Sequence, residues 1–165
     1  PKCIELLRKG SVDISVINIP EKTSYNNITV KRTKTIRDVF IASSHFKELK
    51  GRKVSLKELE KYPLLVLEQN STTREFFDKL MAKHGVSIKP EIELGSVDIL
   101  IEMAKIGLGI TFVPDESIKD QLENEDIFVI DIKEEIPERS LGFLIHSNIP
   151  LPLAASKFVE LLERG

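Results

Sequence analysis

Apolar residues recur along the chain with two different periods, and the two periods alternate. Apolar positions three or four residues apart predict amphipathic helices, whereas alternating or continuous β-branched runs predict strands. Leu64–Leu67 is a continuous apolar run, which is typical of a buried strand in an α/β sheet. Because strands and helices follow one another in turn, we expect an α/β fold with a substantially parallel sheet. The expected strands cover residues 12–17, 28–34, 36–42, 64–67, 91–94, 110–113, 127–132 and 140–145, and the expected helices cover 2–9, 55–62, 72–84, 97–105, 115–122 and 153–162.

Start and stop signals support these helices. Two capping boxes, Ser55 to Glu58 and Thr72 to Glu75, place a hydroxyl three residues before a glutamate at a helix start. Glycines 10 and 85 follow helical segments and predict their C-terminal ends. The first helix begins at residue 2 with no cap before it, which we interpret as a sign of missing upstream sequence.

Composition places the chain among ordinary globular proteins. It has 165 residues, of which 41% are hydrophobic and 30% charged, with a net charge of −2. This length suffices for one domain or two small lobes with a sizeable core. There is no run of roughly 20 apolar residues, no export leader, and only one cysteine, so no internal disulfide is possible. We therefore expect a soluble, cytoplasmic protein that does not grip nucleic acid by itself.

Charge is unevenly distributed along the chain. Residues 31–61 contain 10 basic and 4 acidic residues, whereas residues 115–139 contain 10 acidic and 3 basic ones. Two solvated faces would explain this distribution. Alternatively, opposite patches of two copies would meet in a head-to-tail dimer.

The residue types of metal centres and of nucleophilic catalysis do not cluster in this sequence. His45, His84 and His146 lie far apart, and Cys3 belongs to the apolar stripe of a predicted helix. Gly107–Gly109 lacks the third glycine of a dinucleotide loop and precedes a strand instead of following one. We therefore expect neither a metal nor a cofactor, and we do not expect an enzyme.

Two turns between a strand and a helix carry the candidate chemistry. Residues 70–73 follow the buried strand and open a helix, and residues 95–96 do the same one unit later. In an open α/β sheet both turns border the crevice beyond the carboxyl ends of the strands. Free N–H groups and the positive end of the helix dipole favour an anion there, although ordinary capping needs the same residues. A small carboxylate or oxyanion is the expected ligand, with hydroxyls from Ser71, Thr72, Thr73 and Ser96.

Six segments, in order, resemble the effector-binding domain of LysR-type transcriptional regulators. Each motif is weak alone, but together they extend over nearly the whole chain. The strongest match is Met103–Ile110 followed by Val113-Pro114. The others are Leu6–Ile14, Val54–Leu64, Ser71–Arg74, Pro90–Glu93 and Ala154–Phe158.

The resemblance implies the two-lobe fold of type 2 periplasmic binding proteins. It places one lobe at residues 1–42 and 114–165 and the other at 43–113, with a small molecule bound between them. The family's winged helix-turn-helix and linker helix are lacking here, and so are the first strand, first helix and second strand of the effector domain. We therefore expect an N-terminally truncated domain with an incomplete pocket.

The resemblance also implies ligand contacts and a mechanism. Family contacts correspond to Asn18 from the first lobe, to the Ser71–Thr73 turn, to Ser96, and to Phe112 and Val113. Effector binding would change lobe closure or dimer geometry and so reposition DNA-binding domains in a dimeric or tetrameric parent protein. The alternatives are a solute-binding receptor of a transporter and an enzyme on the same fold, for which Lys105 and Glu68 are the titratable groups to compare.

Overall fold

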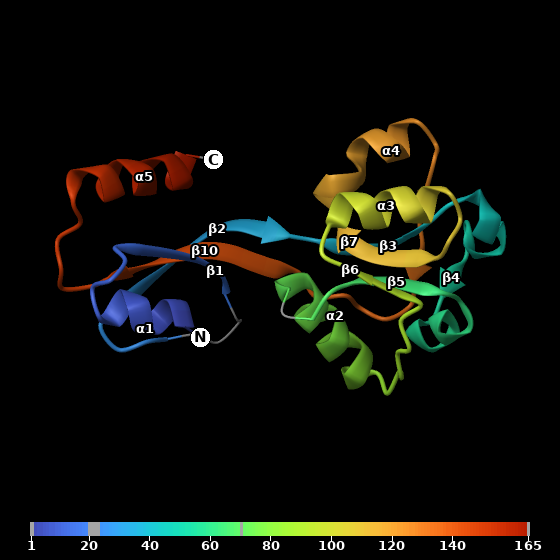
Figure 1. Ribbon diagram of the computed structural model, residues 1–165, viewed down its shortest axis with the longest axis horizontal. Helices are drawn as coiled ribbons and strands as arrows, with labels where there is room; N and C mark the ends of the chain where they lie inside the picture. The colour runs from blue at the N-terminus through green and yellow to red at the C-terminus, as the bar shows by residue number, and fades with distance from the viewer. Residues whose placement is uncertain (1, 20–23, 70, 165) are drawn as a thin grey trace. The chain divides into compact units, whose positions relative to one another are not determined.

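In the computed structural model, the chain forms two compact units. The structure describes residues 2–19, 24–69 and 71–164. The first unit comprises residues 1–36 and 138–165, and the second comprises residues 37–137. Each unit has its own sheet and its own helices, and each is described by itself below (Figure 1).

The first unit is a three-stranded antiparallel sheet with a helix on each face (Figure 1). The strand order is β1-β10-β2, so the strand from the end of the chain lies in the middle. Ile4 and Leu7 of the first helix pack with Ile28 and Leu144 to form its core. The elements are α1 (Lys2–Arg8), β1 (Ile14–Ile19), β2 (Ile28–Ile36), β10 (Arg139–His146) and α5 (Leu153–Arg164).

The second unit is built on a five-stranded mixed sheet in the order β6-β5-β7-β3-β8. Strands β5, β6 and β7 run parallel to one another, while β3 runs antiparallel to β7 and β8. Two further short strands, β4 and β9, form a separate parallel pair. The strands are β3 (Asp38–Ala42), β4 (Lys53–Val54), β5 (Leu64–Leu67), β6 (Ile92–Leu94), β7 (Ile110–Pro114), β8 (Phe128–Val129) and β9 (Asp131–Ile132).

Helices cover both faces of this sheet (Figure 1). Helix α2 packs Phe77, Leu80 and Met81 against one face, and α3 packs Leu100 and Ile101 against the other. Burial on both faces explains why the central strand β5 is apolar at every position. The helices are η1 (Ser44–Leu49), η2 (Leu56–Lys61), α2 (Thr72–Lys83), α3 (Val97–Lys105), η3 (Asp115–Ile118) and α4 (Lys119–Glu123).

The predicted elements are present, with corrections at their boundaries. The first strand is displaced by two residues to 14–19, and the expected strand 127–132 is divided into β8 and β9. The helix that follows the first capping box is a 3₁₀ helix, and the one after Pro114 is a 3₁₀ turn continued by α4. The expectation of a substantially parallel sheet holds for β5, β6 and β7 and for the β4-β9 pair, whereas the three-stranded sheet is wholly antiparallel.

The two units do not divide at 42/43 and 113/114, as the resemblance implied, but at 36/37 and 137/138. Strand β3 belongs to the second unit because both of its neighbours, β7 and β8, lie in that unit's sheet. Residues 114–137 also belong there, because Ile118, Ile127 and Ile130 are buried in its two cores.

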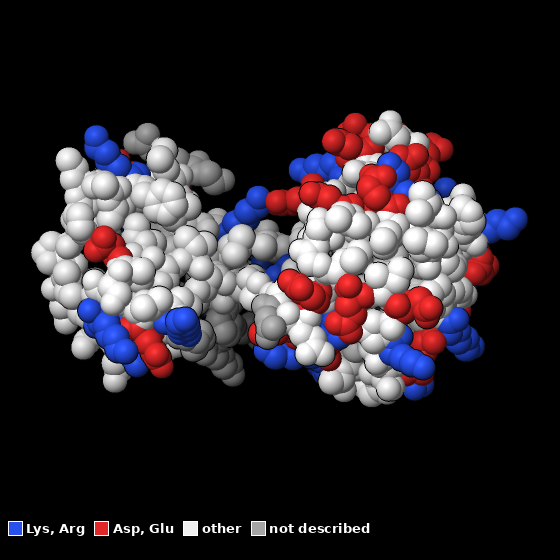
Figure 2. All heavy atoms as spheres, viewed as in Figure 1, with Lys and Arg blue, Asp and Glu red and all other residues white. Residues whose placement is uncertain are grey.

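The basic and acidic stretches meet within one chain. The backbones of Lys53 in β4 and Asp131 in β9 are in register, and Arg37 Nε lies 3.1 Å from Asp115 Oδ2. Other acidic side chains gather over α4 (Figure 2). These contacts lie within one chain, and the charge-paired dimer stays a prediction. In the part of the chain that the structure describes, no helix is long and apolar enough to cross a membrane.

Candidate functional site

The two predicted turns lie next to each other at one edge of the second unit's sheet. Strands β5 and β6 are parallel neighbours, with Leu67 in register with Leu94. The amide of Glu68 donates to the carbonyl of Leu94 over 2.9 Å, which joins the residues where the two turns begin. The N-termini of α2 and α3 therefore start from the same edge of one sheet, as predicted.

Ser71, and not Thr72, is the N-cap of α2. Its backbone is extended, and its Oγ accepts a hydrogen bond from the amide of Arg74 over 3.1 Å. Thr72 is already the first helical residue, so the predicted capping box from Thr72 to Glu75 is displaced by one position. This displacement leaves the Thr72 side chain exposed and Thr73 half-buried. Asn70, also expected in this turn, lies outside the described residues.

The second turn is capped in the same way. Ser96 Oγ accepts a hydrogen bond from the amide of Ile99 over 3.4 Å at the start of α3. Gly95 lies against the first turn, because a Cβ at this position would be 3.2 Å from Glu68 Oε1. The described residues give the Glu68 carboxylate neither a hydrogen bond nor an ion pair. Where the two turns meet there is thus a carboxylate that has no partner among the described residues.

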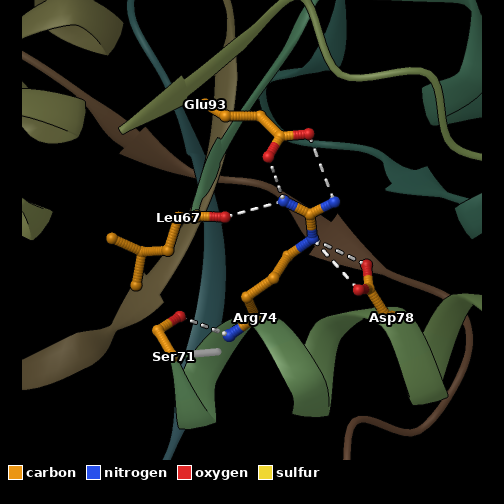
Figure 3. Close-up of polar contacts among 5 residues, drawn as sticks. All are labelled: Leu67, Ser71, Arg74, Asp78 and Glu93. Carbon is orange, nitrogen blue, oxygen red and sulfur yellow. Dashed lines mark hydrogen bonds and ion pairs between the residues drawn. The ribbon is translucent and has the colours of Figure 1, made fainter. Parts of the chain in front are cut away.

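Arg74 is the basic residue of the first turn, and its charge is neutralised by carboxylates (Figure 3). Its side chain is 8% exposed. Nη1 donates to the carbonyl of Leu67 over 2.7 Å and lies 3.2 Å from Glu93 Oε2, while Nε lies 2.9 Å from Asp78 Oδ1. Burial would lower the pKa of Arg74, but its hydrogen bonds to Asp78 and Glu93 outweigh burial and raise it. An anion at this turn would therefore interact mainly with backbone N–H groups and hydroxyls.

Phe112 and Val113 lie on opposite faces of β7, so their side chains pack in different cores. Phe112 is 4% exposed, and its ring centroid is 4.7 Å from that of Phe40. It also lines a small apolar space beside Thr73 and Arg74. Val113 has no exposed surface and packs in the core under α3. Strand alternation turns the Val113 side chain into that core, and a ligand contact at this residue stays a prediction.

Asn18 belongs to the first unit. It lies within β1, in register with Leu141, and not after the strand as expected. Its Oδ1 accepts a hydrogen bond from Arg139 Nη1 over 3.2 Å. Its side chain is thus held by the neighbouring strand, whose Arg139 is itself 9% exposed.

Lys105 and Glu68, the two titratable groups that the enzyme alternative requires, do not lie close together. Lys105 lies at the C-terminal end of α3, whereas Glu68 lies beside the turn that precedes the N-terminal end. Lys105 Nζ is 3.2 Å from both Glu102 Oε1 and Asp126 Oδ2, and hydrogen bonds to these carboxylates raise the pKa of Lys105. The pair therefore offers no acid and base for one reaction. Across the described ranges, histidine, cysteine and acidic side chains form no group that would hold a metal ion.

Comparison with known proteins identifies the family. The family model described as "LysR substrate binding domain" matches residues 1–165, so the chain belongs to this family of ligand-binding domains. A probable RuBisCO transcriptional regulator from Porphyra purpurea is 25% identical over 146 residues, covering 84% of this chain and 45% of that protein. The chain thus spans about half the length of the curated relatives it matches.

Solved structures show the same fold. The Synechocystis PCC6803 CcmR regulatory domain in complex with 2-PG has a TM-score of 0.81 and 16% identity, and it is matched over 99% of this chain and 77% of its own. The effector-binding domain of QuiR in complex with shikimate has a TM-score of 0.76 and 16% identity, over 99% and 76%. The fold is therefore that of LysR effector-binding domains, as the sequence motifs implied.

Sequence reasoning missed Arg74 and Glu93. Both residues belong to segments that resemble the family, Ser71–Arg74 and Pro90–Glu93, but neither was expected to take part in the site. A local signal existed for Arg74, since Asp78 follows it at the four-residue spacing of a helical ion pair. The contact with Glu93 crosses from α2 to β6 and has no local signature.

Proposed function

We propose that this chain senses a small anionic metabolite for a LysR-type transcriptional regulator. The observation that carries the proposal is the pair of serine-capped helix N-termini at one edge of the β5-β6 pair. Such ends attract negative charge and present N–H groups without intrahelical partners. A carboxylate or an oxyanion satisfies both features. The shikimate bound by the effector domain of QuiR is a carboxylate, which supports this ligand class.

Ser71, Thr72 and Thr73 on one turn and Ser96 on the other are the proposed anion contacts. Asn18 is proposed as a further ligand contact, together with Val113, and Phe112 is proposed to close the apolar side beside Thr73. Glu68 adds a requirement, because its carboxylate would repel a second negative charge and accept a hydrogen bond from a hydroxyl or amine. A small hydroxy or amino acid therefore suits these turns better than a dianion.

The proposed mechanism is a shift between two arrangements of the domain. An effector shifts such an equilibrium only if it binds the two arrangements with different affinity. The parent protein would be a cytoplasmic homo-oligomer, with DNA contacted by another domain, and this chain would take no catalytic part. The names of the curated relatives support a regulator rather than a transport receptor with the same fold.

A thermal-shift screen of the complete effector domain tests the proposal. The panel contains shikimate, other small hydroxy acids, amino acids, and phosphate and sulfate as bare oxyanions. A ligand at about 100 times its Kd stabilises a protein by roughly 2.7 kcal/mol, which raises Tm by several degrees. We expect stabilisation by an acid that carries a hydroxyl or amino group. Stabilisation by neutral ligands alone would overturn the anion assignment and leave the family assignment in place.

A further inference from the structure

The guanidinium of Arg74 connects the two turns through the protein. Arg74 is the third residue of α2, and its amide is capped by Ser71. Its side chain reaches across to Glu93 of β6, where Nη1 is 3.2 Å from Oε2 and Nη2 is 3.4 Å from Oε1. Glu93, drawn opposite the guanidinium in Figure 3, precedes Ser96, the cap of the second turn, by three residues in the sequence. One side chain thus joins the start of α2 to the strand that leads into α3.

The Arg74 guanidinium makes one contact within α2 and others to the neighbouring strands. Asp78 lies one turn further along α2, so its bond to Nε stays within the helix. The bonds to the Leu67 carbonyl and to Glu93 leave the helix and reach β5 and β6. Only a planar fork with several donors can make all of these contacts at once, and a lysine cannot. The low exposure of the Arg74 side chain limits competition from water.

We propose that the Arg74–Glu93 pair is a positioning device that sets the spacing between the N-termini of α2 and α3. Arg74 is a positioning residue here, because it would act on a ligand only through Ser71, Ser96 and the backbone between them. The importance of this spacing for an effector rests on the function proposed above. The link itself is a property of the chain without ligand, so it can be tested separately.

Amide hydrogen exchange of the ligand-free protein, resolved by NMR, tests the link from the β6 side. In Glu93→Gln we expect the amide of Arg74, which Ser71 caps, to exchange about threefold to tenfold faster, since a half-exposed ion pair is lost. Glu91→Gln removes an exposed carboxylate two residues away and serves as the control. The amide of Phe112 in β7 reports global opening of the same unit. Equal exchange of the Arg74 amide in both variants would overturn the proposal.

A second pair of variants tests the link from the α2 side. Arg74→Lys keeps the charge and removes the fork, whereas Asp78→Asn removes only the contact within the helix. We expect Arg74→Lys to speed exchange of the Ile99 amide at the start of α3 about threefold or more, and Asp78→Asn to leave it unchanged. An Ile99 amide that does not respond to Arg74→Lys would show that the two turns are set independently. Neither result depends on the effector, so a failed ligand screen and a failed link remain distinguishable.

Discussion

Asn18 Oδ1 accepts a hydrogen bond from Arg139 Nη1 over 3.2 Å, although the two residues are 121 positions apart in the chain. The bond joins β1 to β10 within the first unit. It fixes the orientation of a side chain that the family resemblance assigns to ligand binding. The same contact gives Asn18 a role in stability that must be separated from any role in binding.

We expect Asn18→Ala to lower the free energy of unfolding by about 1 kcal/mol, which is the net value of a typical hydrogen bond. If Asn18 also contacts the effector, the affinity of the domain for the effector falls by more than the loss of stability explains. Chemical denaturation and a ligand titration of the same samples separate the two effects. Thr29→Ala, which removes an exposed side-chain contact with Ser147 in the same unit, is the control. Equal affinity in Asn18→Ala and Thr29→Ala would remove Asn18 from the site.

Thr72 and Ser71 are neighbours with separable roles. Thr72→Val removes an exposed hydroxyl from the first position of α2, so we expect an almost unchanged Tm and a weaker affinity for the effector. Ser71→Ala removes the cap and should cost about 1 kcal/mol of stability. Thermal unfolding and titration of both variants test this division. An unchanged affinity in Thr72→Val would show that its hydroxyl does not contact the ligand.

Local sequence signals explain which parts of the fold were predictable. The stops at Gly10 and Gly85 are confirmed, since both have a φ of +66°, and so is the cap of α3 at Ser96. Such features depend on a few adjacent residues. The antiparallel direction of β3 and the division at residue 36/37 depend on pairing between distant strands, which no local pattern encodes.

The candidate site was likewise predictable where a local signal exists and was missed where none does. The two turns were predictable because a buried strand followed by a hydroxyl residue marks a helix start. The displaced cap at Ser71 was missed because Thr72 and Glu75 satisfy the same motif one residue later. The opposite orientations of Phe112 and Val113 were not foreseen, because the resemblance transfers a segment and not the face of the strand that each side chain occupies.

Gly109 is packed too closely to accept a side chain. A Cβ there would lie 2.6 Å from the carbonyl oxygen of Pro63 and 2.9 Å from Leu65 Cγ. Because one of these neighbours is backbone, Gly109→Ala should shift the strand and cost about 1–3 kcal/mol, and Gly109→Val should cost more. In the control Gly95→Ala, the Cβ meets the flexible end of Glu68 at 3.2 Å. We expect Tm to fall clearly in Gly109→Ala and much less in Gly95→Ala. Equal falls in Tm for the two variants would contradict the packing argument.

Acid should weaken the second unit through two glutamates of η2. A hydrogen bond from Arg52 lowers the pKa of Glu58 below 4.5, and hydrogen bonds from Lys57 and the amide of Ser87 lower that of Glu60. A group whose pKa is lower in the folded state stabilises it above the unfolded value, and this contribution is lost as pH falls through the folded pKa. The stabilisation is therefore present above about pH 4.5 and disappears below it.

We expect Tm to fall between pH 5 and pH 3, and the fall to be smaller when both carboxylates are removed, as in Glu58→Gln with Glu60→Gln. Glutamine does not titrate, so the double variant lacks these two contributions at every pH. Its Tm at pH 7 should lie below that of the parent chain, and the two curves should approach each other as the pH falls through the lowered pKa values. Glu91→Gln, which alters an exposed carboxylate elsewhere in the unit, should keep the full slope. Parallel curves for the double variant and the parent chain would show that the ion pairs of η2 do not contribute to acid sensitivity.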